Sequence, residues 1–558
     1  MSSFFTIPGA QKKRKRPEGT EPPKKRFATT KAPSREPKSK APPRKPQRDE
    51  SISGSDSESD GAAPQDDPET SGSESGEEET AAERRLRLAE RYLENIREEV
   101  VDPEGFDAED IDRDLIAERL KEDVAESKGR IYRKLAGELA FTEARHSSFR
   151  NNTETVTAIA TCAPWAYTVS KDMALTKWKI QDLPSEQYKT KKKKKSWKPP
   201  PPKRVPEQVA YVRGDRRKAK DNAYQGHVDA ILCVAASQDG KYVVTGGRDR
   251  RIIVWDASTL KPVRVFSQHR DAVTGLAFRR GTNQMYSASK DRTIKVWSLD
   301  ELAYVETLFG HQDEVVDVAS LAQERCISVG ARDRTARLWK VVEETQLVFR
   351  GGGSGRKAKG SVLEGSMDRI AMIDEEMFVT GSDNGSLSLW TMHKKKPIFT
   401  LPLAHGLDPP LAAEEASAET HPSLSILPPA QPRWITALTT IPYSDIILSG
   451  SWDGHVRAWK LSDDKKKIEE IGPISSSEVE GEHEVKSAKG VVNDISVFER
   501  GDRGKDGVCV VVATGKEHRL GSWQRRAIPG ARNGAVVYEV ERLAEEKEKK
   551  VNGHVEDS

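Results

Sequence analysis

Three histidines in this sequence have the same spacing to an aspartate, and two of them also to a hydroxyl residue. Each histidine precedes its aspartate by 22 residues, and in two copies a threonine or serine lies four residues before that aspartate. A histidine between a hydroxyl and a carboxylate can activate the hydroxyl as a nucleophile. A fixed period across several copies favours architecture over catalysis, because every repeat of a structural unit carries the same residues. The repeated residues are His227, Asp249, Trp255, His269, Asp291, Trp297, His311, Asp333 and Trp339.

The period of these residues identifies the fold. The tryptophans at 255, 297 and 339 are 42 residues apart, and each follows an aspartate by six residues. The same spacing of six recurs in Asp172 with Trp178, Asn384 with Trp390, Asp453 with Trp459 and Glu517 with Trp523. The pattern resembles the WD40 repeat, in which each copy forms one four-stranded blade. Seven copies predict an all-β, seven-bladed propeller.

In WD40 repeats the aspartate ties the histidine of the preceding loop to the turn between the second and third strands. A strand hydroxyl and the tryptophan extend that network, which holds the blade only if its buried members are satisfied. The expected hydroxyls are Thr168, Thr245, Ser287, Thr380 and Ser449, with Val329 and Ala513 in their place in repeats four and seven. By this spacing repeats one, five, six and seven lack the histidine, so only repeats two and three are expected to be complete. We predict a structural role for these residues and no enzyme activity.

A second pattern places positive charge in the same turns. The residue before the aspartate position is basic in five repeats, and an arginine follows that aspartate in three. Such turns share one face of a WD40 disc, so they predict a basic arc that attracts phosphates or acidic peptides. The alternative is that the position tolerates any solvated polar residue; Asp383 and Trp452 interrupt the arc in repeats five and six. The candidate RNA- or partner-binding residues are Lys171, Arg248, Arg250, Lys290, Arg292, Arg332, Arg334 and Lys516, with a less regular cluster of His518, Arg519, Arg525, Arg526 and Arg532.

The N-terminal region differs in composition from the repeats. Residues 1–50 hold 15 Lys or Arg against 5 Asp or Glu, whereas residues 51–79 hold 10 acidic and no basic residues. We expect a disordered basic and then acidic arm over residues 1–79, followed by an amphipathic helical segment over 80–140 that begins with a capping box at residues 80–83. Two basic clusters predict nuclear import. They are Lys12, Lys13, Arg14, Lys15 and Arg16, and Lys24, Lys25 and Arg26.

The propeller is predicted to span residues 145–541. Insertions are expected near 187–220, 351–361, 402–433 and 462–489, with a charged tail at 542–558. Either the run at 536–540 or the segment near Phe149 could supply the strand that closes the ring. Four widely spaced cysteines contain no CxxC pair, so we expect no metal or redox site, and no cofactor. No run of 18 apolar residues predicts a membrane span, and no apolar core for secretion is present at the N-terminus.

Several stretches resemble one WD40 family more closely than the repeat itself requires. They are residues 79–97 (ETAAERRLRLAERYLENIR), 119–136 (RLKEDVAESKGRIYRKLA), 269–297 (HRDAVTGLAFRRGTNQMYSASKDRTIKVW), 304–315 (YVETLFGHQDEV), 431–435 (QPRWI), 517–523 (EHRLGSW) and 531–533. The chain is similar over residues 79–540 to the family of WD40 proteins specific to the U3 small nucleolar ribonucleoprotein.

The resemblance implies a function in the nucleolus. It implies that the chain joins the U3 box C/D particle through the box B/C element of U3 snoRNA, together with the kink-turn-binding protein. The particle acts in the small-subunit processome and supports the cleavages that yield 18S rRNA. The alternative is a generic nuclear adaptor, such as a histone-binding protein or a ubiquitin-ligase substrate receptor. Receptors of the second kind carry Arg two residues after the WD pair, whereas Ser258 stands there after Asp256.

Overall fold

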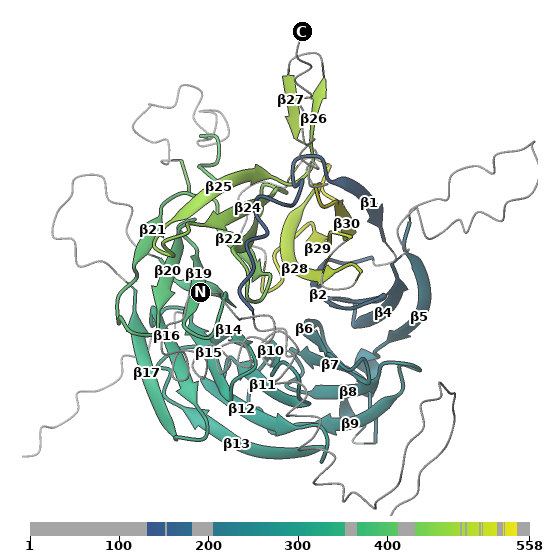
Figure 1. Cartoon of the computed structure of the whole chain (residues 1–558). Helices are drawn as coiled ribbons and strands as arrows, with labels where there is room; N and C mark the ends of the chain where they lie inside the picture. Colours follow the sequence, from purple (N-terminus) through teal and green to yellow (C-terminus); the bar gives the residue numbers. More distant parts are fainter. Residues whose placement is uncertain are drawn as a thin grey trace, which may run out of the picture. The chain divides into compact units, whose positions relative to one another are not determined.

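The computed structural model describes residues 131–543, apart from 151–152, 181–204, 222, 352–364, 411–429, 480–481, 486–487, 502–503, 505, 522–527 and 529. All of these residues belong to one compact unit, Glu90–Ser558. The described chain forms seven four-stranded antiparallel sheets arranged as blades around a ring (Figure 1). The prediction of an all-β, seven-bladed propeller is therefore confirmed.

Blades one to six each use four consecutive strands, from the innermost to the outermost. The strands are, in blade one, β2 (Val156–Cys162), β3 (Trp165–Ser170), β4 (Ala174–Lys179) and β5 (Glu207–Arg213); in blade two, β6 (Ile231–Ala236), β7 (Tyr242–Gly247), β8 (Ile252–Asp256) and β9 (Pro262–Phe266); in blade three, β10 (Val273–Phe278), β11 (Gln284–Ser289), β12 (Thr293–Ser298) and β13 (Ala303–Phe309); in blade four, β14 (Val315–Ser320), β15 (Arg325–Gly330), β16 (Thr335–Lys340) and β17 (Thr345–Arg350); in blade five, β18 (Met367–Met372), β19 (Met377–Ser382), β20 (Leu387–Thr391) and β21 (Phe399–Leu401); and in blade six, β22 (Ile435–Thr440), β23 (Ile446–Ser451), β24 (Val456–Leu461) and β25 (Ile468–Pro473).

Blade seven is built from both ends of the described chain. It contains β28 (Val491–Glu499), β29 (Val508–Gly515), β30 (Gly534–Val540) and, as its outermost strand, β1 (Arg145–Phe149). In this register Ser147 of β1 lies opposite Val537 of β30. Both candidates for ring closure therefore take part, β30 as the third strand and β1 as the fourth.

The hydrophobic core lies between neighbouring blades, because each sheet packs both of its faces against another sheet. The second strands are almost fully buried, as in β11, whereas the outermost strand β13 contains no buried residue. Trp297 is fully buried, and its ring centroid lies 4.5 Å from that of Phe266 in the preceding blade. Burial on both faces explains why runs such as IIVW in β8 are continuously apolar and do not alternate with polar residues.

The assignment of the seventh repeat was wrong. Glu517 and Trp523 do not form the turn and third strand of blade seven, because β30 pairs with β29 along its whole length and the 516–533 segment connects the two. The register places Tyr538 opposite Val510, the position that Trp459 occupies opposite Ile447 in blade six. Blade seven therefore lacks the repeat tryptophan altogether.

Two predicted insertions contain blade strands. The segment 187–220 includes β5 and a short 3-10 helix, η1 (Arg216–Lys220), and the segment 462–489 includes β25. The rest of the second segment forms a separate hairpin of β26 (Ser476–Val479) and β27 (Glu482–Val485), which projects from the rim in Figure 1. Charged residues in these outer strands hid them in the sequence.

Residues 131–140 do not form the predicted helix. They are extended or in turns, with isolated bridges from Arg133 to Ser444 and from Leu139 to Arg542. Leu135, Leu139 and Phe141 are buried against blades six and seven. The apolar residues that predicted a helical stripe here contact the ring instead.

Some predictions concern residues outside the described part of the chain. The two import clusters at residues 12–16 and 24–26 lie there, as do the arm over 1–79, the helical segment up to residue 130, and the tail beyond 543. None of the helices among the described residues is long and apolar enough to cross a membrane.

Candidate nucleic-acid interface

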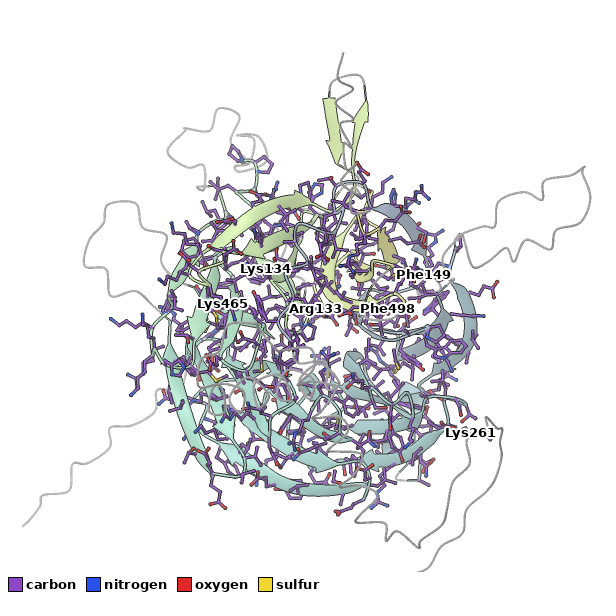
Figure 2. All side chains as sticks on the ribbon, viewed as in Figure 1. Arg133, Lys134, Phe149, Lys261, Lys465 and Phe498 are labelled. Carbon is purple, nitrogen blue, oxygen red and sulfur yellow. The ribbon has the colours of Figure 1, made fainter. Side chains whose placement is uncertain are left out.

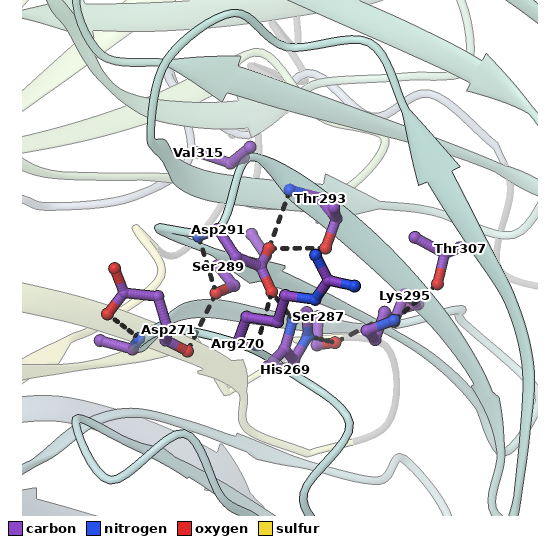
Figure 3. Close-up of polar contacts among 12 residues, drawn as sticks. His269, Arg270, Asp271, Ser287, Ser289, Asp291, Thr293, Lys295, Thr307 and Val315 are labelled. Atoms are coloured by element: carbon purple, nitrogen blue, oxygen red, sulfur yellow. Dashed lines mark hydrogen bonds and ion pairs between the residues drawn. The ribbon is translucent and has the colours of Figure 1, made fainter.

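In blades two, three, four and six, the turn between the second and third strands is held by the repeated polar residues. In blade three, His269 Nδ1 lies 2.9 Å from Asp291 Oδ2 and its Nε2 lies 2.8 Å from Ser287 Oγ (Figure 3). The indole of Trp297 donates to the same Ser287 oxygen at 2.8 Å. Asp291 also accepts hydrogen bonds from the backbone NH groups of Arg270 and Thr293. The carboxylate therefore connects the loop before the blade to the turn inside it.

This network has the connectivity of a catalytic triad but cannot act as one. The two ring nitrogens of His269 contact the aspartate on one side and the serine hydroxyl on the other, as in a triad. Ser287 is fully buried and His269 is 4% exposed, so no substrate carbonyl can approach the hydroxyl oxygen. The Trp297 indole already occupies that oxygen as a donor. The burial and hydrogen bonding of this network therefore support a structural role for its residues.

The complete network occurs in four blades, two more than predicted. In blade six, His405 contacts Asp453 at 3.1 Å and Ser449 at 2.8 Å. The spacing of 22 residues missed this histidine because an insertion separates it from its aspartate by 48 residues. In blade four the hydroxyl belongs to Ser328, not to the position of Val329.

The turn of blade four is one residue longer than that of blade three. The backbone NH of Ala331 makes the bond to the preceding loop that Lys290 makes in blade three. Arg332 is therefore the additional residue, and its own NH donates to Asp313. The regular spacing of six residues to the tryptophan concealed this insertion.

Burial and hydrogen bonding act in opposite directions on the carboxylates of these networks. Burial would raise the pKa of Asp291, but the bonds from His269, Thr293 and Arg270 hold that pKa well below its usual value. The net pKa shift is also downward for Asp249, Asp333 and Asp453, where the histidine contributes to the lowering. All four carboxylates are therefore charged at neutral pH.

The predicted arc of cations is exposed in the same turns. Arg250, Arg292 and Arg334 have positive φ values of 67°, 68° and 52°, whereas Gly385 and Gly454 occupy this position in blades five and six. A left-handed backbone is unfavourable for a residue with a Cβ, yet it points three long cationic side chains away from the blades. With Arg248, Arg332 and Lys516, these arginines form a set of six exposed cations that make no ion pair with another described residue; we call this set the basic arc.

Two predicted members of the arc are neutralised in part. Lys171 lies 3.0 Å from Glu517, and Lys290 lies 2.8 Å from Glu314. Both lysine side chains are less exposed than their acidic partners. Because their charges are already paired, we do not include these two lysines in the basic arc.

The second predicted cluster is not a surface patch. Arg519 is 3% exposed, and its guanidinium donates to the carbonyl oxygens of Thr274 and Val316 at 2.7 and 3.1 Å. These oxygens lie on the innermost strands β10 and β14, so the side chain inserts into the axis of the ring. Burial and the nearby Arg369 lower the pKa of Arg519 to about 10. His518 is also buried, which lowers its pKa far below the usual value.

The sequence predicts a surface position for Arg519 because several other arginines follow it within 13 residues. No local pattern indicates that its side chain is buried at the ring axis. Arg525 and Arg526 lie outside the described residues, whereas Arg532 is exposed. The described residues contain no group of three or more His, Cys, Asp or Glu side chains placed to hold a metal ion.

An aromatic pair fills the interruption of the arc. Trp434 precedes β22 and Trp452 follows β23, and their ring centroids are 5.3 Å apart. Both rings are half-buried, and Trp452 Nε1 donates to Asp408 at 3.2 Å. The face that carries the basic arc therefore presents indoles in blade six, where Trp452 had been interpreted only as a break.

The family model of the WD domain, G-beta repeat, matches residues 220–256, 260–298, 303–340 and 424–460. Together with the ring and the blade networks, this match defines a WD-repeat β-propeller, a non-catalytic scaffold. The family model does not match blades one, five and seven, which the four-stranded sheets identify.

Comparison with known proteins identifies the family of WD-repeat propellers to which the chain is similar. The chain is 38% identical to ribosomal RNA-processing protein 9 of Saccharomyces cerevisiae, over 82% of this chain and 89% of that protein. It is 36% identical to U3 small nucleolar RNA-interacting protein 2 of Mus musculus, over 84% and 83%. A crystal structure of RRP9 WD40 repeats aligns with a TM-score of 0.55 and 31% identity, covering 72% of this chain and all of that one. The chain belongs to this family of U3-associated WD-repeat proteins.

Proposed function

We propose that this chain is a non-catalytic, RNA-binding subunit of the U3 box C/D particle. It binds the box B/C region of U3 snoRNA together with the kink-turn-binding protein, and supports processing of pre-rRNA to 18S rRNA in the small-subunit processome. Family membership supports the role in rRNA processing and a nucleolar location. The observation that carries RNA binding is the basic arc, in which Arg248, Arg250 and Arg292 extend from adjacent blades on one face.

The geometry of the arc suits a phosphate backbone. Six exposed cations distributed over blades two, three, four and seven can each contact a different phosphate. Each neutralised phosphate releases condensed counterions, so the association constant falls as the salt concentration rises. On a log–log plot, each phosphate contact adds about 0.7 to 0.9 to the steepness of this slope. Because every member is exposed, little desolvation opposes binding.

RNA is favoured over an acidic peptide because the same face carries the pair of Trp434 and Trp452. Indoles stack on bases, with about 1–3 kcal/mol per base in single-stranded complexes. A carboxylate peptide gains nothing from such stacking. The alternative of a generic nuclear adaptor that binds acidic peptides therefore predicts no contribution from the two tryptophans.

The test reverses the charge of Arg248, Arg292 and Arg334 to Glu together. The matched control reverses Lys241, Lys261 and Arg264, which are exposed on blade two outside the arc. Binding of box B/C RNA is measured between 50 and 300 mM salt. We expect the arc variant to bind at least about 30-fold more weakly, with a salt slope smaller by about 2, while the control binds like the parent. Equal affinity and slope in both variants would remove the arc from the proposal.

A further inference from the structure

A cavity of about 900 Å³ opens on the face opposite the basic arc. The innermost strands begin near the turns of the arc and end around this cavity, so all seven blades contribute to its wall. Its side chains are mainly apolar, and they include Leu276, Phe278, Met372 and Phe498. The cavity is therefore an apolar opening on the ring axis, separate from the RNA-binding face.

The start of the described chain is fixed at the mouth of this cavity. Ile131 and Arg133 both line it, and Ile131 is 39% exposed there. Arg133 forms an ion pair with Glu499, and its backbone NH donates to Tyr443 at 2.8 Å. Figure 2 shows Arg133 and Phe498 near the centre of the ring. The preceding residues must therefore leave from the edge of the cavity.

The segment before Ile131 matches the cavity in polarity and charge. Ile116, Leu120 and Val124 are four residues apart, which places them on one face of a helix. Residues 101–130 also hold 11 Asp or Glu against 5 Lys or Arg. The cavity offers Arg280 beside its apolar wall, whereas Arg279 is already paired with Glu324 at 3.2 Å. An acidic amphipathic segment therefore has an apolar wall for one face and a cation for the other.

We propose that residues 111–130 of this same chain fill the cavity as an intramolecular plug. A helix about 10 Å across occupies about 900 Å³ over roughly two turns, which is enough to bury Leu120 and Val124. The six residues between Val124 and Ile131 span at most about 24 Å when extended, so the segment can reach the cavity. The plug would leave the basic arc on the other face accessible to RNA.

Cys162 provides a direct readout, because it lines the cavity and is half-buried, whereas Cys233, Cys326 and Cys509 are fully buried. The reaction of Cys162 with a maleimide is measured in the full-length native protein. Replacing Leu120 and Val124 by Ser removes the apolar contacts of the plug. We expect labelling of Cys162 to become about tenfold faster, while the three buried thiols stay unreactive and show that the ring is intact.

The control replaces Arg119 and Asp123 by Ser, which changes neighbouring positions and keeps the net charge. It should label at the parental rate. A second variant, Val124→Cys, should form a disulfide with Cys162 under mild oxidation, whereas Asp107→Cys, which lies before the proposed plug, should not. Fast labelling of the parent, or equal rates in all proteins with no disulfide, would overturn the proposal and leave the cavity open to another partner.

Discussion

Blades three and seven have the same strand order but are held together differently. In blade three, one aspartate links a histidine, a hydroxyl and a tryptophan across the turn. In blade seven, Val512 and Tyr538 occupy the hydroxyl and tryptophan positions, and the two ends of the described chain pair with each other instead. The polar network is therefore one way to fix a blade, and it is dispensable where strand pairing and apolar packing close the ring.

The largest expected effect comes from breaking the network of blade three. Asp291→Ala leaves His269 and two backbone NH groups without their acceptor in a buried site. Removing one partner of such a buried interaction costs about 3–5 kcal/mol. The measurement is the urea midpoint of the full-length protein. The same midpoint for Asp291→Ala and the parent would contradict the difference drawn between the two blades.

The next largest effect is expected at the closure of blade seven. Phe149 of β1 is 5% exposed and packs edge-on against Trp178, with ring centroids 4.6 Å apart. Phe149→Ala removes this contact and should cost about 3 kcal/mol. The control is Ser147→Ala on the same strand, which should change the free energy of unfolding by less than about 0.5 kcal/mol. If both variants behave alike, β1 contributes pairing only.

A smaller effect is expected on the pH dependence of stability, to which only the blades with the aspartate network should contribute. The pKa values of Asp249, Asp291, Asp333 and Asp453 are lowered on folding. Their contribution to stability is thus present above the unfolded pKa of about 3.9 and is lost as pH falls toward the folded pKa values. We expect the urea midpoint of the parent to decrease as the pH is lowered from 5 to 3. In Asp291→Asn, the loss of unfolding free energy over this range should be smaller by about 1 kcal/mol. An unchanged slope would remove the carboxylate of blade three as its cause.

The smallest effect concerns the left-handed turn residues. Arg334→Gly relieves the positive φ of blade four, where blades five and six already carry glycine. We expect stability to change by less than about 1 kcal/mol, because relief of strain offsets the greater freedom of the unfolded chain. RNA binding should weaken measurably in the same variant. A large loss of stability would show that Arg334 supports the blade as well as the proposed arc.

The repeated aspartate and tryptophan predicted most of the fold. Trp178, Trp255, Trp297, Trp339, Trp390 and Trp459 each donate their indole NH to a strand hydroxyl in the blade assigned to them. Such a network requires fixed spacing, so it is visible in one sequence. His405 was missed because a histidine can contact the turn across an insertion of any length. The run LAHG at 403–406, just after a strand, was the available signal.

Strand pairing over long distances was not predictable in the same way. The outer strands β5 and β25 contain exposed charged residues and resemble loops. Glu517 and Trp523 matched the repeat spacing by coincidence, and β30 carries no repeat residue. The burial of Arg519 depends on carbonyl oxygens of β10 and β14, about 200 residues or more away along the chain. No local pattern carries such information.

Closure of the ring by β1 and β30 has a consequence for synthesis of the protein. Ser147 pairs opposite Val537, so 537 − 147 = 390 residues must follow it before its partner exists. At about 5–20 residues per second this takes on the order of 20–80 s. During that time β1 is an unpaired edge on the ribosome, where apolar edges would aggregate. Its sequence, RHSSF, is mostly polar, which suits a strand that must wait for the end of translation before it can pair.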